Sequence, residues 1–346
     1  MSIGPRRITK DMELGKEKSP SLKKDIGGKG DKQESLKIDL NIVVPKYSLS
    51  DLIVPAHTAT SIRDFLAHKK YESLIYDEWG LNETHQHQKQ IAINLYGPPG
   101  TGKTMAAYGI AKELNQPLIM IDYASLESKY VGETSKNIVA IFQQAKEQKA
   151  IIFFDEADAM LSRRVTGMSH ATDVSVNQTR SVLLTEMNNH EGLIIFTTNF
   201  IENYDPAFMR RILAHIYFDL PDLECRLKLW QQYIPTKLPH NADLKELAEI
   251  SETLTGSDIS NSVRKAAMAA ARRGAKEVDV EDFLKAIEEI KKSKAANKNQ
   301  SHHKKQNRKQ SESKDSELKS TESTRVVSEE YVVSQLGTEK TEELKA

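Results

Sequence analysis

The chain has 346 residues, with 49 Lys plus Arg, 49 Asp plus Glu and one cysteine, Cys225. Equal numbers of opposite charges give no reason to expect a nucleic-acid or membrane partner for the chain as a whole. A single cysteine excludes a disulfide framework within the chain. No apolar run approaches the roughly 18 residues of a membrane span, and residues 1–19 lack the apolar core of a secretory signal, so we expect a cytoplasmic protein.

Both ends of the chain are predicted to be disordered. Residues 1–45 and 292–346 are rich in small and charged residues, with few large apolar groups to offset the entropy of ordering. The stretch 291–309 is strongly basic. A solvated linker is the simpler interpretation of this charge, and weak nucleic-acid binding through the basic tail is the alternative.

Between the tails, short apolar runs alternate with amphipathic stretches. Strands are predicted at 91–96, 118–122, 151–154, 193–198 and 215–218, and helices at 103–114, 133–148 and 178–189. This alternation is typical of a parallel sheet sandwiched by helices, here an α/β domain over 46–220. Helical spacing then predominates, which predicts a small α-helical domain over 221–291. Ser257, Asp258 and Asp279 are its candidate helix caps.

The first chemical motif follows the strand at 91–96. It reads Gly97-x4-Gly102-Lys103-Thr104 and runs into a predicted helix, the context of a phosphate-binding loop rather than of a Gly-Pro turn. Glycines let backbone N–H groups approach phosphates, and the helix N-terminus favours the anion. Lys103 would reach the β- and γ-phosphates, and the Thr104 hydroxyl would bind Mg²⁺. The predicted ATP-binding loop comprises Gly97, Pro98, Pro99, Gly100, Thr101, Gly102, Lys103, Thr104 and Met105.

Two acids follow the apolar run at 151–154. Ligands of parallel sheets bind beyond the carboxyl ends of the strands, where Asp155 is expected. Its carboxylate suits Mg²⁺, and Glu156 is placed to polarise an attacking water. An acidic pair after a strand can also be only a helix cap, but its place after the phosphate loop favours the catalytic interpretation.

Taken together, these segments resemble the AAA+ ATPases and, within them, the AAA clade of protein remodellers. The resemblance covers about 48–290, and the single-module layout resembles that of bacterial or phage AAA proteins. Beyond the phosphate loop it rests on LESKYVGETSKNI (126–138), IIFFDEADAM (151–160), TTN (197–199), DPAFMRRI (205–212) and TGSDI (255–259). These resemble the first pore loop, Walker B, sensor 1, the arginine-finger segment and the start of the lid helix.

The resemblance implies roles for single residues around the nucleotide. Asn199 would contact the γ-phosphate or the attacking water, although an Asn can also simply cap a strand. Arg210 or Arg211 would reach the ATP of a neighbouring subunit; the further arginines common in the clade are replaced by Ala214 and His215. On the adenosine side the implied contacts are Gly256 and Ser257, together with Ile53 and Val54.

The pore loop would carry the mechanical function. Tyr130, flanked by Lys129 and Val131, would grip a polypeptide in a central pore, whereas an aromatic between a strand and a helix is otherwise a core residue. The polar segment 162–177 would be a second pore-facing loop. The expected protein is a homo-hexameric remodeller or unfoldase that uses ATP and Mg²⁺ on an unidentified protein substrate, without a membrane partner. The alternative is an AAA+ ATPase that acts on nucleic-acid complexes or serves as a nucleotide-dependent switch that recruits a partner.

Other candidates have simpler interpretations. His85 and His87 could ligate a metal, but a polar loop before the strand at 91–96 is the preferred interpretation. Trp79 and Trp230 are predicted to be packing residues.

Overall fold

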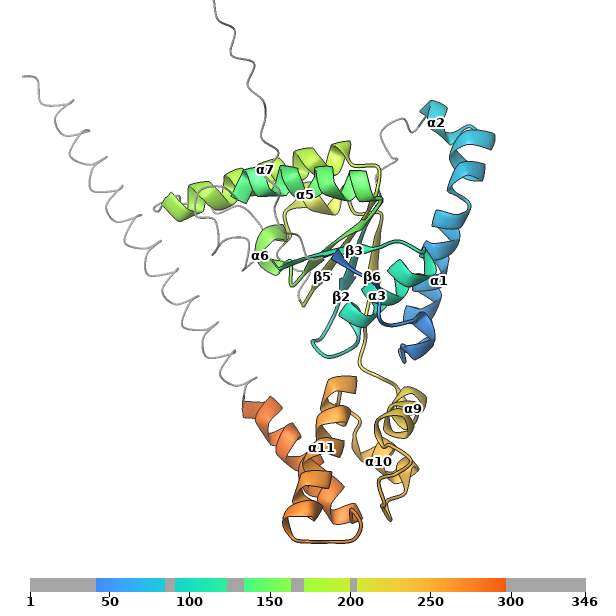
Figure 1. The fold of residues 1–346 in the computed structure, drawn as a ribbon, viewed down its shortest axis with the longest axis vertical. Coiled ribbons are helices and arrows are strands. Elements are labelled where there is room, and N and C mark those ends of the chain that lie inside the picture. Colours follow the sequence, from blue (N-terminus) through green and yellow to red (C-terminus); the bar gives the residue numbers. More distant parts are fainter. Residues whose placement is uncertain (1–41, 85–90, 123–133, 163–170, 200–203, 297–346) are drawn as a thin grey trace, which may run out of the picture. The chain divides into compact units, whose positions relative to one another are not determined.

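The computed structural model describes residues 42–84, 91–122, 134–162, 171–199 and 204–296 (Figure 1). Six strands form one sheet in the order β1-β3-β4-β5-β2-β6, parallel except for β1, which runs antiparallel to β3. The fold class is therefore confirmed, with a mixed rather than fully parallel sheet. The strands are β1 (Ile42–Val43), β2 (Ile91–Tyr96), β3 (Leu118–Asp122), β4 (Ile151–Asp155), β5 (Leu193–Thr198) and β6 (Ala214–Tyr217).

The sheet begins inside the predicted N-terminal tail. Ile42 and Val43 pair with Ile119 and Leu118 of β3, so the expected boundary at residue 45 was wrong by a few residues. Both are β-branched, and β3 offers them an otherwise unpaired edge. A two-residue strand is too short to show alternation in the sequence.

Helices cover both faces of the sheet (Figure 1). Alternate residues of β4 point to opposite cores: Phe154 packs with α5 (Thr134–Gln148) and α7 (Ala171–Asn189), and Phe153 with α1 (Ala56–Lys70) and α3 (Lys103–Glu113). Burial on both faces explains why the central strands are almost wholly apolar. Burying each such side chain contributes about 1.5–3 kcal/mol.

Two local expectations were wrong. The predicted loop 162–177 is helical from Ala171, because α7 begins there; the sequence has no Gly or Pro between that residue and Asn177 to stop a helix. Trp79 is not a packing residue, since 68% of it is exposed, whereas Trp230 is fully buried as expected.

Several short elements were not predicted from the sequence. They are η1 (Leu49–Asp51), η2 (Leu74–Glu78), which Trp79 directly follows, α2 (Leu81–Thr84), α6 (Asp158–Leu161) and α8 (Pro206–Met209).

The lid is helical, as predicted. It comprises α9 (Leu223–Tyr233), α10 (Leu244–Ile250), α11 (Gly256–Arg272) and a further helix over 280–296. Its core centres on Trp230, whose ring meets that of Phe283 edge to face at 5.9 Å. Thr255, rather than Ser257, is the N-cap of α11, and it forms a capping box with Asp258. The last helix continues past the predicted tail boundary at residue 291.

None of the helices in the described part of the chain is long and apolar enough to cross a membrane.

Candidate nucleotide site

One cavity of about 360 Å³ brings together most of the predicted nucleotide contacts. It lies at the carboxyl ends of β2, β4 and β5. The predicted residues on its wall are Ile53, Val54, Pro99, Gly100, Thr101, Gly102, Lys103, Thr104, Met105, Asp155, Glu156, Asn199, Gly256 and Ser257. The residues that the sequence did not predict are Asp51, Leu52, Pro55, Thr197, Thr198, Asp219, Pro221, Leu229, Gln232 and Tyr233.

Strand order explains why the catalytic segments meet. β5 lies between β2, which feeds the phosphate loop, and β4, which ends in Asp155. Tyr96 is paired with Thr198, and Phe154 with Phe196, so the three strands end side by side. The residues after β5 are therefore placed between the phosphate loop and the acids.

The phosphate loop needs its glycines for space and for conformation. Gly97 has φ +139°, and a Cβ there would lie 2.2 Å from the carbonyl oxygen of Phe218. Gly100 has φ +79°, and its Cβ would lie 2.8 Å from the Thr255 hydroxyl oxygen. Side chains at these positions would require the loop to move. The loop then enters α3 at Lys103, so the helix N-terminus faces the cavity.

The Lys103 ammonium is held inside this loop. It donates to the carbonyl oxygens of Gly97 (2.7 Å) and Pro98 (2.9 Å) and to Oδ1 of Asn199 (3.1 Å). Gly97 and Pro98 thus support the site through Lys103. Burial lowers the pKa of Lys103, and the negative charges of Asp158, Asp155 and Glu156 oppose that shift. A partly desolvated cation fixed at a helix N-terminus is suited to binding phosphate oxygens.

The expected magnesium ligands lie next to each other on the cavity wall. The Thr104 hydroxyl lies 3.4 and 3.3 Å from the two carboxylate oxygens of Asp155. The described residues contain no cluster of three or more His, Cys, Asp or Glu side chains for a metal. One hydroxyl and one carboxylate fit a cation that takes its remaining ligands from water and phosphate, as Mg²⁺ does.

Thr197 is a functional residue that the sequence analysis missed. Its hydroxyl donates to Oδ1 of Asp155 and accepts the backbone N–H of Glu156 at 3.1 Å. Glu156 has φ +51°, an uncommon conformation for a residue with a side chain. Thr197 therefore fixes both acids, and only the pairing of β4 with β5 reveals this role.

We expect Thr197→Val to lower ATP turnover by roughly tenfold, less than the about 10²–10³ lost with a donor that contacts the reacting atoms directly, because Thr197 acts through the two acids. The replacement keeps the shape of the side chain but leaves Asp155 and the Glu156 N–H each without one partner. Nucleotide affinity should change by less than about twofold, because no phosphate contact is removed. Steady-state ATPase and equilibrium ADP binding measure the two effects. Thr197→Ser restores the hydroxyl and is the matched control; equal losses in both variants would contradict the role.

Asn199 occupies the position expected of a γ-phosphate sensor. Its side chain contacts Lys103, and its backbone N–H lies 3.2 Å from both carboxylate oxygens of Asp158. It is therefore more than a strand cap, since the side-chain amide points to the ammonium of the phosphate loop. Asp158, from α6, was not predicted.

The wall on the lid side joins three segments. Ile53 and Val54 follow η1, Gln232 and Tyr233 end α9, and Ser257 lies in the first turn of α11. Burial raises the pKa of Tyr233 above that of an exposed tyrosine. The helical spacing of α9 suggested only packing for these side chains, so Tyr233 was missed.

Arg210 and Arg211 do not line the cavity of their own chain, and they differ in environment. Arg211 is held internally: its Nε donates to Oδ1 of Asn188 at 2.6 Å and its Nη1 to the Ala207 carbonyl at 2.8 Å. Arg210 follows α8 and is exposed.

Several predicted residues lie outside the described part of the chain. They are Lys129, Tyr130, Val131, His85 and His87, so their predicted roles stay predictions.

Comparison with known proteins agrees with this geometry. Residues 93–220 match the model of the ATPase family associated with various cellular activities (AAA), and residues 241–285 match the AAA+ lid domain. This module belongs to the AAA family of ATPases. The family match supports ATP hydrolysis by this module, and most of the residues that line the cavity lie within the two matched ranges.

Similar proteins include two archaeal relatives and one solved AAA domain. A cell division cycle protein 48 homolog of Archaeoglobus fulgidus is 36% identical over 60% of this chain and 30% of its own length. A proteasome-activating nucleotidase of the same organism is 37% identical over 58% of this chain and 52% of its own. The AAA domain of FIGL-1 has a crystal structure that superimposes with a TM-score of 0.60, at 25% identity over 72% of this chain and 85% of that one. The chain thus spans about a third to a half of the length of the two Archaeoglobus fulgidus relatives.

Proposed function

We propose that this AAA ATPase is a protein remodeller or unfoldase that works as a homo-hexameric ring. Relatives whose names describe proteasome activation, together with the AAA-clade resemblance of 126–138, support a protein substrate. A cytoplasmic location is part of this proposal.

The proposal of a ring rests on the charge of the cavity wall, which includes a single cationic side chain among the described residues. Of the described residues that line the cavity, Lys103 is the sole cation, while Arg210 is exposed elsewhere on the same chain. Phosphoryl transfer develops charge that a second cation, supplied by a neighbouring subunit, stabilises. A contact in which one subunit's Arg210 enters the next subunit's site is head-to-tail, and a head-to-tail contact forms a ring when the rotation between subunits closes.

The proposed cofactor is Mg²⁺, held by Thr104 and by Asp155 directly or through water. When bound, the ion would neutralise charge on the phosphate oxygens. Thr197 orients the carboxylate of Asp155 for this task, and Glu156 accepts a proton from the attacking water.

The alternative, action on nucleic-acid complexes, loses part of its support. Lys291 and Lys294 of the basic stretch 291–309 lie in the last helix and donate to the lid. Those two charges are engaged within the chain. A chain ending at Ala296 keeps these contacts, so any salt-dependent DNA binding that it loses would come from the tail alone.

We expect Tyr130→Ala to separate ATP use from mechanical work. The residue is proposed to grip the substrate polypeptide and to touch neither phosphate nor Mg²⁺. Basal ATPase should therefore stay within a few-fold of wild type, whereas stimulation by an unfolded protein such as casein should be lost. Measuring both rates and the melting temperature on one preparation tests this.

Tyr130→Phe is the matched control and should keep most of the stimulation, because the ring remains. A buried aromatic would behave differently: truncation to Ala would cost about 3–5 kcal/mol of stability. A Tyr130→Ala variant that melts far lower and loses basal ATPase in proportion would make Tyr130 a core residue. Full stimulation of the ATPase by casein in that variant would show that Tyr130 is not needed to grip the substrate.

A further inference from the structure

The C-terminal turns of the helix over 280–296 contact the end of α10, the loop after it and the first turn of α11. Lys291 Nζ donates to the Ile250 carbonyl at 2.6 Å. Lys294 Nζ donates to the Thr253 carbonyl at 3.1 Å and to Oδ2 of Asp258 at 2.6 Å. Lysine is a suitable partner for the free carbonyls where a helix ends, as α10 does at Ile250.

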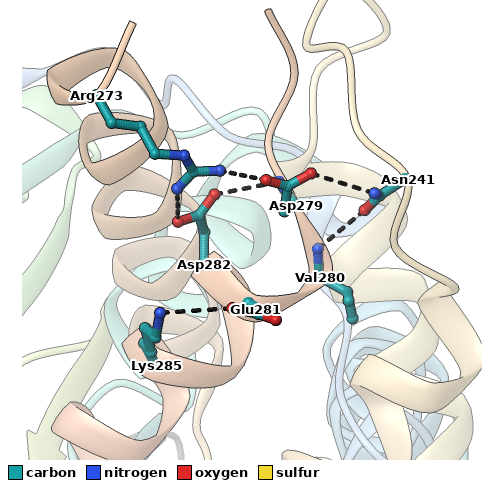
Figure 2. Close-up of polar contacts among 7 residues, drawn as sticks. All are labelled: Asn241, Arg273, Asp279, Val280, Glu281, Asp282 and Lys285. Atoms are coloured by element: carbon teal, nitrogen blue, oxygen red, sulfur yellow. Dashed lines mark hydrogen bonds and ion pairs between the residues drawn. The ribbon is translucent and has the colours of Figure 1, made fainter. Parts of the chain in front are cut away.

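The start of the same helix is also held by polar contacts. The Arg273 guanidinium bridges the carboxylates of Asp279 and Asp282, as Figure 2 shows. Asn241 accepts the Val280 N–H at 2.9 Å and donates to Oδ1 of Asp279 at 3.2 Å (Figure 2). The two lysines therefore extend from a helix that is anchored at its other end, so their contacts constrain the segment they reach.

Asp258, the partner of Lys294, organises the first turn of α11. Its Oδ2 atom accepts the Thr255 N–H at 2.9 Å and the Thr255 hydroxyl at 2.8 Å, and its own N–H donates to that hydroxyl at 3.4 Å. Only 19% of the Asp258 side chain is exposed, compared with 35% of Lys294. A carboxylate that is largely removed from water binds its cation more strongly than a fully exposed one would.

This first turn of α11 is also the lid wall of the nucleotide cavity. The Ser257 N–H donates to the Gly100 carbonyl at 3.3 Å, and Gly256 and Ser257 line the cavity beside the phosphate loop. A displacement of the Thr255–Asp258 turn would therefore break or lengthen the hydrogen bond from Ser257 to Gly100.

We propose that Lys294 is a positioning residue for nucleotide: it holds Asp258 and thereby sets the lid turn that closes the ATP site. The role belongs to the described helix end and not to the tail that follows it. It adds a function to the basic stretch, whose composition indicated only a linker or a nucleic-acid contact. The inference rests on the cavity being the ATP site.

The test is a comparison of Lys294→Ala with Lys292→Ala in the full-length chain. Lys292 lies on the same helix and forms only an exposed i,i+4 pair with Glu288, so its loss removes the same charge without touching the lid turn. We expect Lys294→Ala to weaken binding of N-methylanthraniloyl-ADP and to raise the KM for ATP by about three- to fivefold. The kcat should stay within about twofold, because Asp155 and Glu156 are unaffected. Lys292→Ala should match wild type.

Two further variants separate positioning from general stability. Lys294→Arg keeps a cation that can reach Asp258 and should recover most of the affinity. In an Asp258→Asn background, Lys294→Ala should weaken ADP binding less than it does in wild type, since its partner charge is gone.

Each failure has a distinct meaning. If wild type does not bind the ADP probe, the assignment of the cavity is wrong and the inference falls with it. If wild type binds and Lys294→Ala binds equally well, the positioning role is wrong while the ATP site stands. Equal losses of affinity in Lys294→Ala and Lys292→Ala, or full additivity with Asp258→Asn, would also overturn the role.

Discussion

Glu156→Gln is expected to leave ATP bound and almost unhydrolysed. The change keeps the size of the side chain but removes the carboxylate that we propose accepts the proton of the attacking water, a contribution of about 10²–10⁴ in rate. Binding should persist, because Lys103 and the phosphate loop are unchanged. Equilibrium binding of ATP and single-turnover hydrolysis, measured on one preparation, report the two properties separately.

Lys103→Ala is the informative comparison for this variant. It removes the ammonium that donates to Gly97, Pro98 and Asn199 and would lose nucleotide binding itself. Two variants of one cavity should therefore fail at different steps. Near-normal turnover in Glu156→Gln would show that another group is the catalytic base.

Arg210→Ala is expected to lower ATPase activity by about 10³–10⁵, the contribution of an arginine finger, which corresponds to roughly 4–7 kcal/mol. The nucleotide affinity of an isolated subunit should not change, since Arg210 does not line its own cavity. The loss should appear in kcat, measured at protein concentrations where the ring is assembled. Wild-type specific activity should also rise with protein concentration, because an isolated subunit lacks the finger.

Arg211→Ala should behave differently. Arg211 is tied to Asn188 and to the Ala207 carbonyl within its own chain, so its loss should loosen the segment that carries Arg210 and lower activity less. If Arg211→Ala lowered the ATPase activity more than Arg210→Ala, Arg211 would be the arginine finger instead of Arg210.

The local part of the site could be predicted from the sequence. The phosphate loop, Asp155 and Glu156 are contiguous with the strands that position them, so a motif and its flanking apolar run are enough. The lid could also be predicted, because its helices show clear apolar spacing. Resemblance to the AAA clade then added Asn199 and the lid turn, which no local rule connects to the loop.

What could not be predicted depends on long-range pairing. The role of Thr197 follows from the adjacency of β4 and β5, which chain order does not reveal. The difference between Arg210 and Arg211 follows from Asn188 on another helix. Lys294 sits in a stretch whose composition resembles a linker, and only its contact with Asp258 shows it to be part of the lid.

We propose that the ATP site of each subunit is completed by Arg210 of a neighbouring subunit. It is tested most directly by mixing Glu156→Gln subunits, which keep the finger, with Arg210→Ala subunits, which keep the catalytic base. In a randomly mixed ring with equal amounts of both, about a quarter of the interfaces combine an intact finger with an intact site. The mixture should therefore recover a substantial fraction of wild-type ATPase although each variant alone is nearly inactive. A mixture no more active than the sum of its parts, under conditions where the two variants demonstrably co-assemble, would contradict the claim.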